Sequence, residues 1–259
     1  MTITSEQHLP LPANWQNTET YRWMGSLPRT AWAWELMRRN PDYRALFSRL
    51  GPASAGEDGE LWPLMRLEDP ELDARSAAVF WRCDVCPEVL PVAASIEFRN
   101  PEVRRLSLRD VHCRVFTLPG GGDHCHVLFA QQGRFFQLSV CGASHLDDGL
   151  LLTPVLSDPA LYAARQLAIR RLGDLVSSGC LRLSFYPQVA RSDRMTRVVQ
   201  ALDGEMAGVP HRDIGIALFG RDRVEREWHH PHNYLRDHVR RAIAHGRELM
   251  LGGFRRLLQ

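Results

Sequence analysis

The chain has 259 residues, of which 44% are hydrophobic, enough for one large domain or two modest ones with a buried core. It contains no apolar run near the roughly 18 residues that a membrane span needs. Its first residues, MTITSEQHLPLPANW, lack the basic start and apolar stretch of a secretory signal. We therefore expect a soluble, cytoplasmic protein.

All 32 residues counted as lysine or arginine are arginines, and they are unevenly distributed. Residues 1–160 contain 15 arginines and 20 acidic residues, whereas residues 161–259 contain 17 arginines and 10 acidic residues. A basic C-terminal half favours a polyanionic partner, because arginine binds phosphates and guanine edges through paired hydrogen bonds. An interface between the acidic half and the basic half is the alternative that charge alone leaves open.

The N-terminal region predicts two short helices. Thr30 is a candidate cap for a helix over AWAWELMRRN, which Asn40-Pro41 would end. The tryptophans of this helix would face the core, whereas Arg38 and Arg39 would point outward as candidate contacts for a protein partner. A second helix over DYRALFSRL would follow and end at Gly51.

Residues 61–155 change to a strand pattern. The segments CRVFTL, HVLFAQQ and RFFQLSV are short, rich in β-branched and aromatic residues, and separated by PGGG and QG. This pattern is typical of antiparallel strands joined by tight turns. LPVAASIEF is a candidate for a further strand, and TPVLSDP would lead out of the region.

From residue 158 onward the apolar spacing becomes helical. Asp158-Pro159 would open a helix over ALYAARQLAIRRLGDLVSSG, Ser192 would cap a helix over SDRMTRVVQALDGEMAG, and RDIGIALFG would form a helix that stops at Gly220. The sequence thus predicts an α+β protein with a small helical N-terminal segment, an antiparallel β-containing middle and an all-α C-terminal region. We place the domain boundary between residues 155 and 156.

The last predicted helix, over LRDHVRRAIAHGRELM, has a line of cations beside an apolar face. Its apolar residues have the spacing of a buried stripe: Leu235, Val239, Ala242, Gly246 and Met250. Arg236, Arg240 and Arg247 fall within roughly 40° of one another on a neighbouring face. A recognition helix needs both a core side and a line of cations. On an ordinary solvated helix, Asp237 and Glu248 would neutralise part of this arginine stripe.

The stretch before this helix, GRDRVEREWHHPHN, supplies further cations. Arg221, Arg223 and Arg226 are candidates for contacts with backbone phosphates, and Trp228 would anchor the connection. Because this connection is longer than the roughly three- or four-residue turn of the simplest motif, we expect a helix-turn-helix variant.

Two pairs of residues suggest a zinc site as an alternative. Cys83 and Cys86 have the two-residue gap that lets two thiolates bind one zinc ion. His124 and His126 lie two apart, so both imidazoles would point to one side of a strand. Against a site built from these four residues, no second C-x-x-C occurs, and cysteine is commonly a buried core residue.

The remaining candidates for chemistry are weaker. His229, His230 and His232 form a loose group, for which contact with phosphate is the better interpretation than a metal site. The six cysteines, in a chain without a signal peptide, are expected to be reduced thiols. PGGGDH lacks the ending of a phosphate-binding loop, and no GxGxxG, GxSxG or HExxH occurs. We therefore expect that the protein is not an enzyme and binds no cofactor. The alternative is a zinc-dependent enzyme, which metal analysis of the purified protein would reveal.

Several strings resemble known domains. DIGIALFGRDRV, followed by Trp228 and LRDHVRRAIAHGRELMLGGFRRLL, resembles the C-terminal domain of RovC-type transcription factors, which regulate type VI secretion. The same domain occurs in excision activators of integrative and conjugative elements. TAWAWELMRRNPDYR and LEDPELDARSAAVFWRCDVCPEVLP resemble the transcriptional-regulator-like domain that often precedes it. Residues 1–155 would then be this regulator-like domain with its β-hairpin region, and residues 156–259 a helical DNA-binding domain of helix-turn-helix variant type.

The resemblance implies a sequence-specific transcriptional regulator, an activator of a type VI secretion or mobile-element transfer operon that works as a homo-oligomer. Its implied partners are double-stranded DNA, further copies of itself, and RNA polymerase or a small anti-activator protein. Its DNA-contacting residues would be Arg236, Arg240, Arg247, Arg221, Arg223, Arg226, His238 and Arg241. Base preference stays open, because His238 replaces a longer side chain that other members can carry. The alternative is a protein-binding anti-activator module that keeps the helical fold without DNA contacts.

Overall fold

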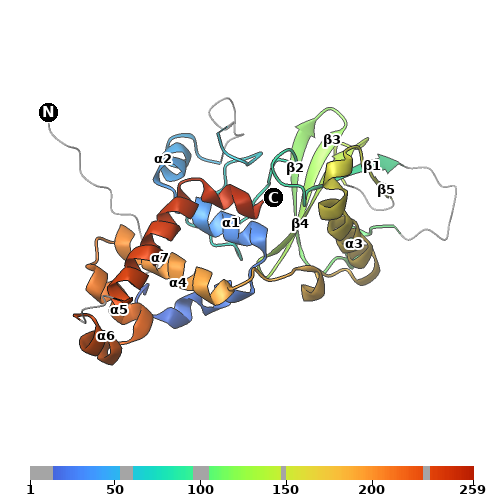
Figure 1. The fold of residues 1–259 in the computed structure, drawn as a ribbon. Helices are drawn as coiled ribbons and strands as arrows, with labels where there is room; N and C mark the ends of the chain where they lie inside the picture. Colours follow the sequence, from blue (N-terminus) through green and yellow to red (C-terminus); the bar gives the residue numbers. More distant parts are fainter. Residues whose placement is uncertain (1–13, 53–60, 96–104, 147–149, 230–233) are drawn as a thin grey trace. The chain divides into compact units, whose positions relative to one another are not determined.

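The computed structural model describes residues 14–52, 61–95, 105–146, 150–229 and 234–259. The chain forms two compact units, whose elements are labelled in Figure 1. The helical unit consists of Met1–Leu27 and Gln188–Gly253, and the sheet unit consists of Pro28–Pro187 and Phe254–Gln259. Each unit is therefore built from segments that are far apart in the sequence.

The elements of the sheet unit, in chain order, are α1 (Arg29–Met37), α2 (Pro41–Leu50), β1 (Leu90–Ser95), β2 (Arg114–Gly121), β3 (His124–Gln131), β4 (Arg134–Cys141), β5 (Leu151–Pro154) and α3 (Tyr162–Ser178). Short 3-10 helices cover Leu108–Asp110, Pro159–Leu161 and Leu183–Phe185. The helical unit contains the 3-10 helix η1 (Thr18–Ser26) and the α-helices α4 (Ser192–Met206), α5 (His211–Phe219), α6 (Arg221–Glu227) and α7 (Tyr234–Met250). A 3-10 helix over Gly253–Leu257 follows α7.

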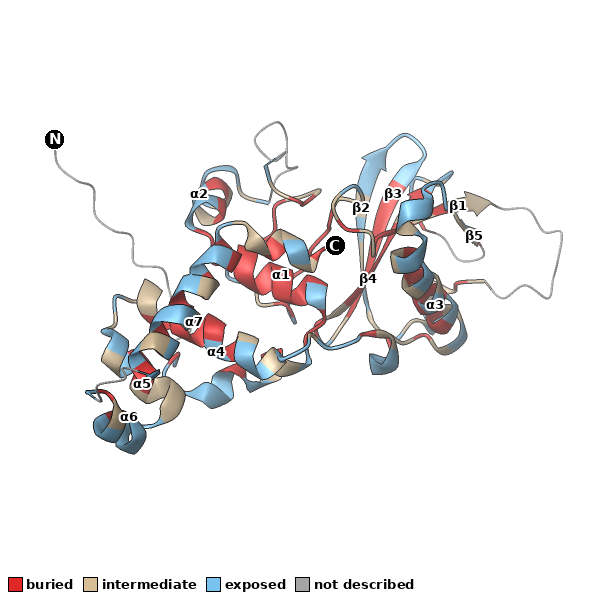
Figure 2. Ribbon diagram, viewed as in Figure 1, coloured by how far each residue is buried: buried red, intermediate tan, exposed pale blue. Residues whose placement is uncertain are grey.

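Helix α1 is buried along almost its whole length (Figure 2). The predicted cap is wrong by two residues: Pro28 precedes the helix, and Thr30 is buried within it. Asn40 does not merely end α1, because its side chain accepts hydrogen bonds from the first turn of α2. The outward placement of Arg38 and Arg39 is also wrong. Their side chains are only 14% and 7% exposed, because both pair with the buried carboxylate of Glu35.

The strands form one sheet in the order β2-β3-β4-β1-β5. β2, β3 and β4 are antiparallel neighbours, as the glycine-containing turns predicted. β1 pairs in parallel with β4 and antiparallel with β5, so the sheet is mixed. The predicted strand LPVAASIEF contains β1, although its last residues lie outside the described ranges, and the first residues of TPVLSDP belong to β5. The α+β fold class is confirmed.

Helix α3 ends where the sequence predicts and packs against the sheet, but the first turn of the predicted helix, Pro159–Leu161, is a 3-10 helix. The Asp158 side chain accepts a hydrogen bond from the Ala160 N–H at 2.9 Å, and Gly179 ends the helix in the left-handed conformation. Leu172 and Leu175 are buried in one hydrophobic core with strand residues such as Val92. α3 is therefore part of the sheet unit.

The core of the helical unit lies between α4 and α7. Six residues of α7 are buried: Leu235, Val239, Ile243, Gly246, Leu249 and Met250. The predicted stripe is thus confirmed except that Ala242 is half-buried and Ile243 takes its place. N-terminal residues complete the core: the Tyr21 hydroxyl donates to the Asp203 carboxylate at 2.7 Å, and the Gln200 amide donates to the Trp15 carbonyl at 3.0 Å.

The two units divide the chain differently from the two expected domains. α3 lies beyond the expected boundary at residue 155 but packs on the sheet, and the last six residues also belong to the sheet unit. Residues 188–253 carry 11 arginines and nine acidic residues, so much of the charge excess of the C-terminal half lies outside the helical unit. A nucleic-acid surface on this unit must therefore depend on how the charges are arranged locally. The boundary at residue 155 stays a prediction about functional domains.

None of the helices described here is long and apolar enough to cross a membrane.

Candidate nucleic-acid interface

A close crossing of α4 and α7 forms the framework of the candidate site. Gly246 lies at this crossing, where a Cβ atom would come within 3.0 Å of the Leu202 Cβ and 3.2 Å of the Val198 carbonyl oxygen. A side chain at this position would hold the helices apart, and glycine lets them approach. The crossing therefore determines which surface residues of α4 and α7 become neighbours.

Helices α5 and α6 follow one another with only Gly220 between them, and α5 packs against both α4 and α7. Gly220 separates them and has φ 86° and ψ 148°, a conformation that favours glycine. Trp228, just after α6, is buried against α5: a Cβ atom on Gly215 would lie 2.8 Å from its ring. Trp228 thus anchors this region, as predicted. The prediction of a long connection is wrong in part, because this stretch contains α6.

The arginine stripe of α7 is exposed, but part of it is paired with acidic residues. Arg240 lies 3.7 Å from Asp237, and Arg247 lies 2.8 Å from Glu205 of α4. Arg236 is exposed on the same side of the helix. Exposed ion pairs such as Arg240–Asp237 contribute only about 0–1 kcal/mol, so a phosphate can replace Asp237. The Glu205 side chain is only 17% exposed, so a phosphate must compete with a half-buried carboxylate for Arg247.

The arginines of α6 have a similar environment. Arg221 lies 3.9 Å from Glu225, and Arg223 lies 3.3 Å from Glu227, each one helical turn away. Arg226 is exposed. Because α6 has as many acidic residues as arginines, it carries no net charge of its own.

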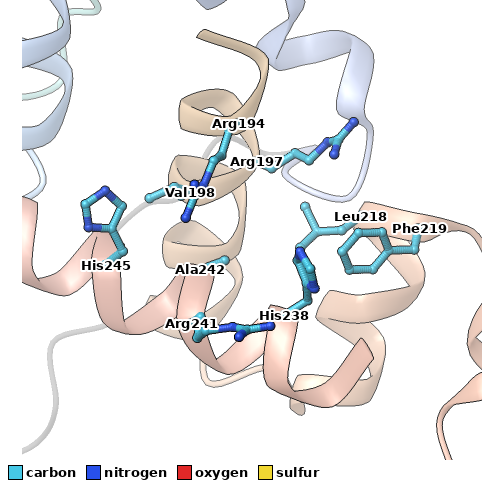
Figure 3. A pocket seen from close by; sticks show the side chains of 9 residues that line it. All are labelled: Arg194, Arg197, Val198, Leu218, Phe219, His238, Arg241, Ala242 and His245. Carbon is cyan, nitrogen blue, oxygen red and sulfur yellow. The ribbon is translucent and has the colours of Figure 1, made fainter. Parts of the chain in front are cut away.

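A groove of about 430 Å³ lies between α4, α5 and α7 (Figure 3). Its cationic or titratable residues come from α4 and α7: Arg194, Arg197, His238, Arg241 and His245. The rest of its wall is apolar: Val198, Leu218, Phe219 and Ala242. No carboxylate is among these described lining residues. The groove is therefore a concave, basic surface with an apolar wall.

The arginines of the groove keep their donors available. Arg194, Arg197 and Arg241 are exposed, and within the described ranges no ion pair joins them to an acidic residue. The two histidines have neighbours: the His245 ring lies 3.1 Å from a Glu248 carboxylate oxygen, and the His238 ring centroid lies 4.7 Å from that of Tyr234. Three guanidinium groups can thus bind an anion without breaking an internal salt bridge.

The groove and the arginine stripe lie on different faces of α7. At about 100° per residue, the groove-lining residues of α7 lie roughly 160° around the helix from Arg236, Arg240 and Arg247. The buried residues lie between the two faces on one side, and Asp237 and Glu248 lie between them on the other. One phosphate cannot contact both faces. The eight residues that the sequence singled out therefore fall into three groups. Three belong to the stripe and three to α6, whereas His238 and Arg241 line the groove.

The candidate zinc ligands do not come together. Among the residues that the structure describes, no group of three or more His, Cys, Asp or Glu side chains is arranged to hold a metal ion. Burial raises the pKa of the Cys86 thiol to about 12. Burial lowers the pKa of His126. His229 is exposed, and His230 and His232 lie outside the described residues.

Sequence reasoning missed Arg194, Arg197 and His245 as groove residues. A signal was present, because Arg194 and Arg197 are three residues apart in SDRMTRVVQALD and therefore share one face of α4. Nothing in the local pattern indicates that this face borders His238 and Arg241, since the neighbourhood depends on the crossing at Gly246.

Two family models match the chain. Residues 152–259 match the family described as "T6SS, Transcription factor, DNA binding domain", which bears the RovC name, and residues 14–66 match the "Proteobacterial transcriptional regulator-like domain". A comparison with curated proteins gave no match. The family matches confirm both resemblances, although LEDPELDARSAAVFWRCDVCPEVLP lies beyond the end of the N-terminal match. Both families are domains of transcriptional regulators and not of enzymes.

Proposed function

We propose that this chain, whose residues 152–259 match the RovC DNA-binding domain, is a transcriptional regulator that activates a type VI secretion or mobile-element transfer operon by binding promoter DNA through its helical unit. The match to that DNA-binding domain is the observation that carries the proposal. The exposed arginines of α4, α6 and α7 support it, because they give this unit surfaces that can bind phosphate.

The proposed DNA contacts are those that the sequence singled out: Arg236, Arg240, Arg247, Arg221, Arg223, Arg226, His238 and Arg241. Phosphate contacts position a protein on the duplex, and contacts with base edges select the sequence. Arginine can make both kinds of contact.

We further propose that the protein works in the cytoplasm as a homo-oligomer. A symmetric oligomer can contact two half-sites at once, which raises both affinity and specificity. Residues 67–151, which include most of the sheet, lie between the two family matches. This region is the candidate surface for self-association and for contacts with RNA polymerase or a small anti-activator protein.

The test is binding of the purified full chain to labelled DNA from its own upstream region and neighbouring promoters. We expect a complex that survives excess competitor DNA and weakens steeply as salt is raised, since binding releases counterions. Absence of a complex even at low salt would contradict the proposal. It would favour the anti-activator module, and a search for a protein partner would then be the next experiment.

The stripe has its own test in the double variant Arg236→Ala/Arg240→Ala. Both side chains are exposed, so the fold should remain intact by circular dichroism, while affinity for the promoter fragment should fall. Unchanged affinity would remove the stripe from the proposed contacts and leave the regulator itself in place.

A further inference from the structure

The groove between α4, α5 and α7 gathers positive charge without internal compensation. Arg194, Arg197 and Arg241 border one space of about 430 Å³, and no carboxylate lines it. Like charges placed together repel one another, and a bound anion relieves that repulsion. The arrangement therefore favours a negatively charged ligand.

Four other arginines of the helical unit pair with carboxylates. Arg240 and Arg247 of the stripe face Asp237 and Glu205, and two arginines of α6 pair with glutamates of the same helix. An anion at those positions must displace a carboxylate, whereas an anion in the groove displaces only water and counterions. On this comparison the groove is the stronger phosphate site.

The apolar part of the groove indicates which kind of anion fits. Val198, Leu218, Phe219 and Ala242 form its wall. A DNA strand alternates charged phosphates with deoxyribose rings that have apolar faces. A basic surface next to an apolar wall matches this alternation better than it matches a free inorganic ion.

We propose that this groove holds the sugar-phosphate backbone of DNA, with Arg194, Arg197 and Arg241 binding its phosphates. The inference rests on the proposed function and adds to it two residues of α4 that the sequence did not indicate. It also makes the groove face of α7, and not the arginine stripe on the other face, the main site of phosphate binding.

The groove also lies next to a residue of α6. Phe219 lines the groove, and the Arg223 guanidinium carbon lies 5.7 Å from the centroid of its ring. The Arg223 side chain thus extends from α6 to the edge of the groove. A DNA backbone held in the groove would therefore lie close to the exposed arginines of α6.

The test uses the triple variant Arg194→Ala/Arg197→Ala/Arg241→Ala of the full chain and a labelled duplex of random sequence. A random duplex suffices because phosphate contacts carry no sequence information. We expect affinity at moderate salt to fall by about 10- to 100-fold, and the slope of log K against log salt to become shallower by about 1 to 3. Arg→Lys changes at the same positions should keep most of the slope, because the charges remain.

A matched control removes the same number of charges elsewhere. Arg49, Arg109 and Arg170 are exposed arginines of the sheet unit, and their replacement by alanine changes the net charge equally. Wild-type binding by the groove variant, or equal losses in both variants, would overturn the inference while the regulator still binds DNA. Failure of the wild-type protein to bind any duplex would instead refute the proposed function, so the two failures are distinguishable.

Discussion

At the scale of single residues, Glu35 shows how charge can be buried in this protein. Its side chain is fully buried in α1, and its carboxylate accepts hydrogen bonds from Arg38 and Arg39 at 2.8 Å and from the Ala74 N–H at 2.7 Å. A buried carboxylate is costly unless it is paired and hydrogen-bonded. The two arginines at the end of the helix therefore turn inward, although their sequence alone favours an exposed position.

Replacing Glu35 with alanine should lower the free energy of unfolding by about 3 to 5 kcal/mol, because two arginines would lose the partner that compensates their burial. Chemical denaturation followed by circular dichroism measures this change. Glu19→Ala is the matched control: Glu19 pairs with Arg22 at the same three-residue spacing, but these side chains are 66% and 80% exposed. The control should change stability by less than about 0.5 kcal/mol. Equal effects of the two substitutions would contradict this account of Glu35.

At the scale of elements, the candidate site depends on how two helices cross. The sequence predicts α4 and α7, most of the buried face of α7 and the stop at Gly220. These features follow from apolar spacing and from the conformation that glycine permits, which are local properties. The groove is not local, because its arginines become neighbours only through the crossing at Gly246. For this reason sequence reasoning found Arg241 on the last helix but could not show that Arg194 and Arg197 lie beside it.

Gly246→Leu should destabilise the helical unit by about 1 to 3 kcal/mol and weaken DNA binding, because the new side chain would push α7 away from α4. Gly173→Leu is the control, since Gly173 is also within a helix but a Cβ atom there has nothing within 4 Å. The control should be neutral or stabilising by up to about 1 kcal/mol, as expected from helix propensity. Denaturation curves and the salt titration of DNA binding measure both effects. A Gly246 variant as stable as the control would show that close approach of the helices is not required.

At the scale of the whole molecule, the chain returns to the sheet unit after α7. Phe254 is buried there and stacks on Trp62, with ring centroids 6.4 Å apart. The Arg29 guanidinium donates to the Arg256 carbonyl at 2.8 Å. The last residues of the DNA-binding match therefore belong to a different compact unit from α7 itself.

Phe254→Ala should cost about 3 to 5 kcal/mol in the unfolding of the sheet unit, because it removes a fully packed ring. Leu251→Ala, three residues earlier, should change stability by less than about 0.5 kcal/mol, since Leu251 is 60% exposed. Hydrogen exchange resolved along the chain would show faster exchange in the sheet unit of the Phe254 variant. Faster exchange confined to α4 and α7 would contradict the assignment of Phe254 to the sheet unit.

The sequence by itself determined most of the helices and strands of this protein, its α+β class and its resemblance to two regulator domains, because these follow from local spacing, from turn residues and from distinctive strings. Tertiary structure alone decided the parallel pairing of β1 with β4, the packing of α3 on the sheet, the burial of Arg39 and the grouping of arginines around the groove. Each of these depends on segments that are far apart in the chain. Their energies come from contacts that form only when those segments meet, so no local pattern could indicate them.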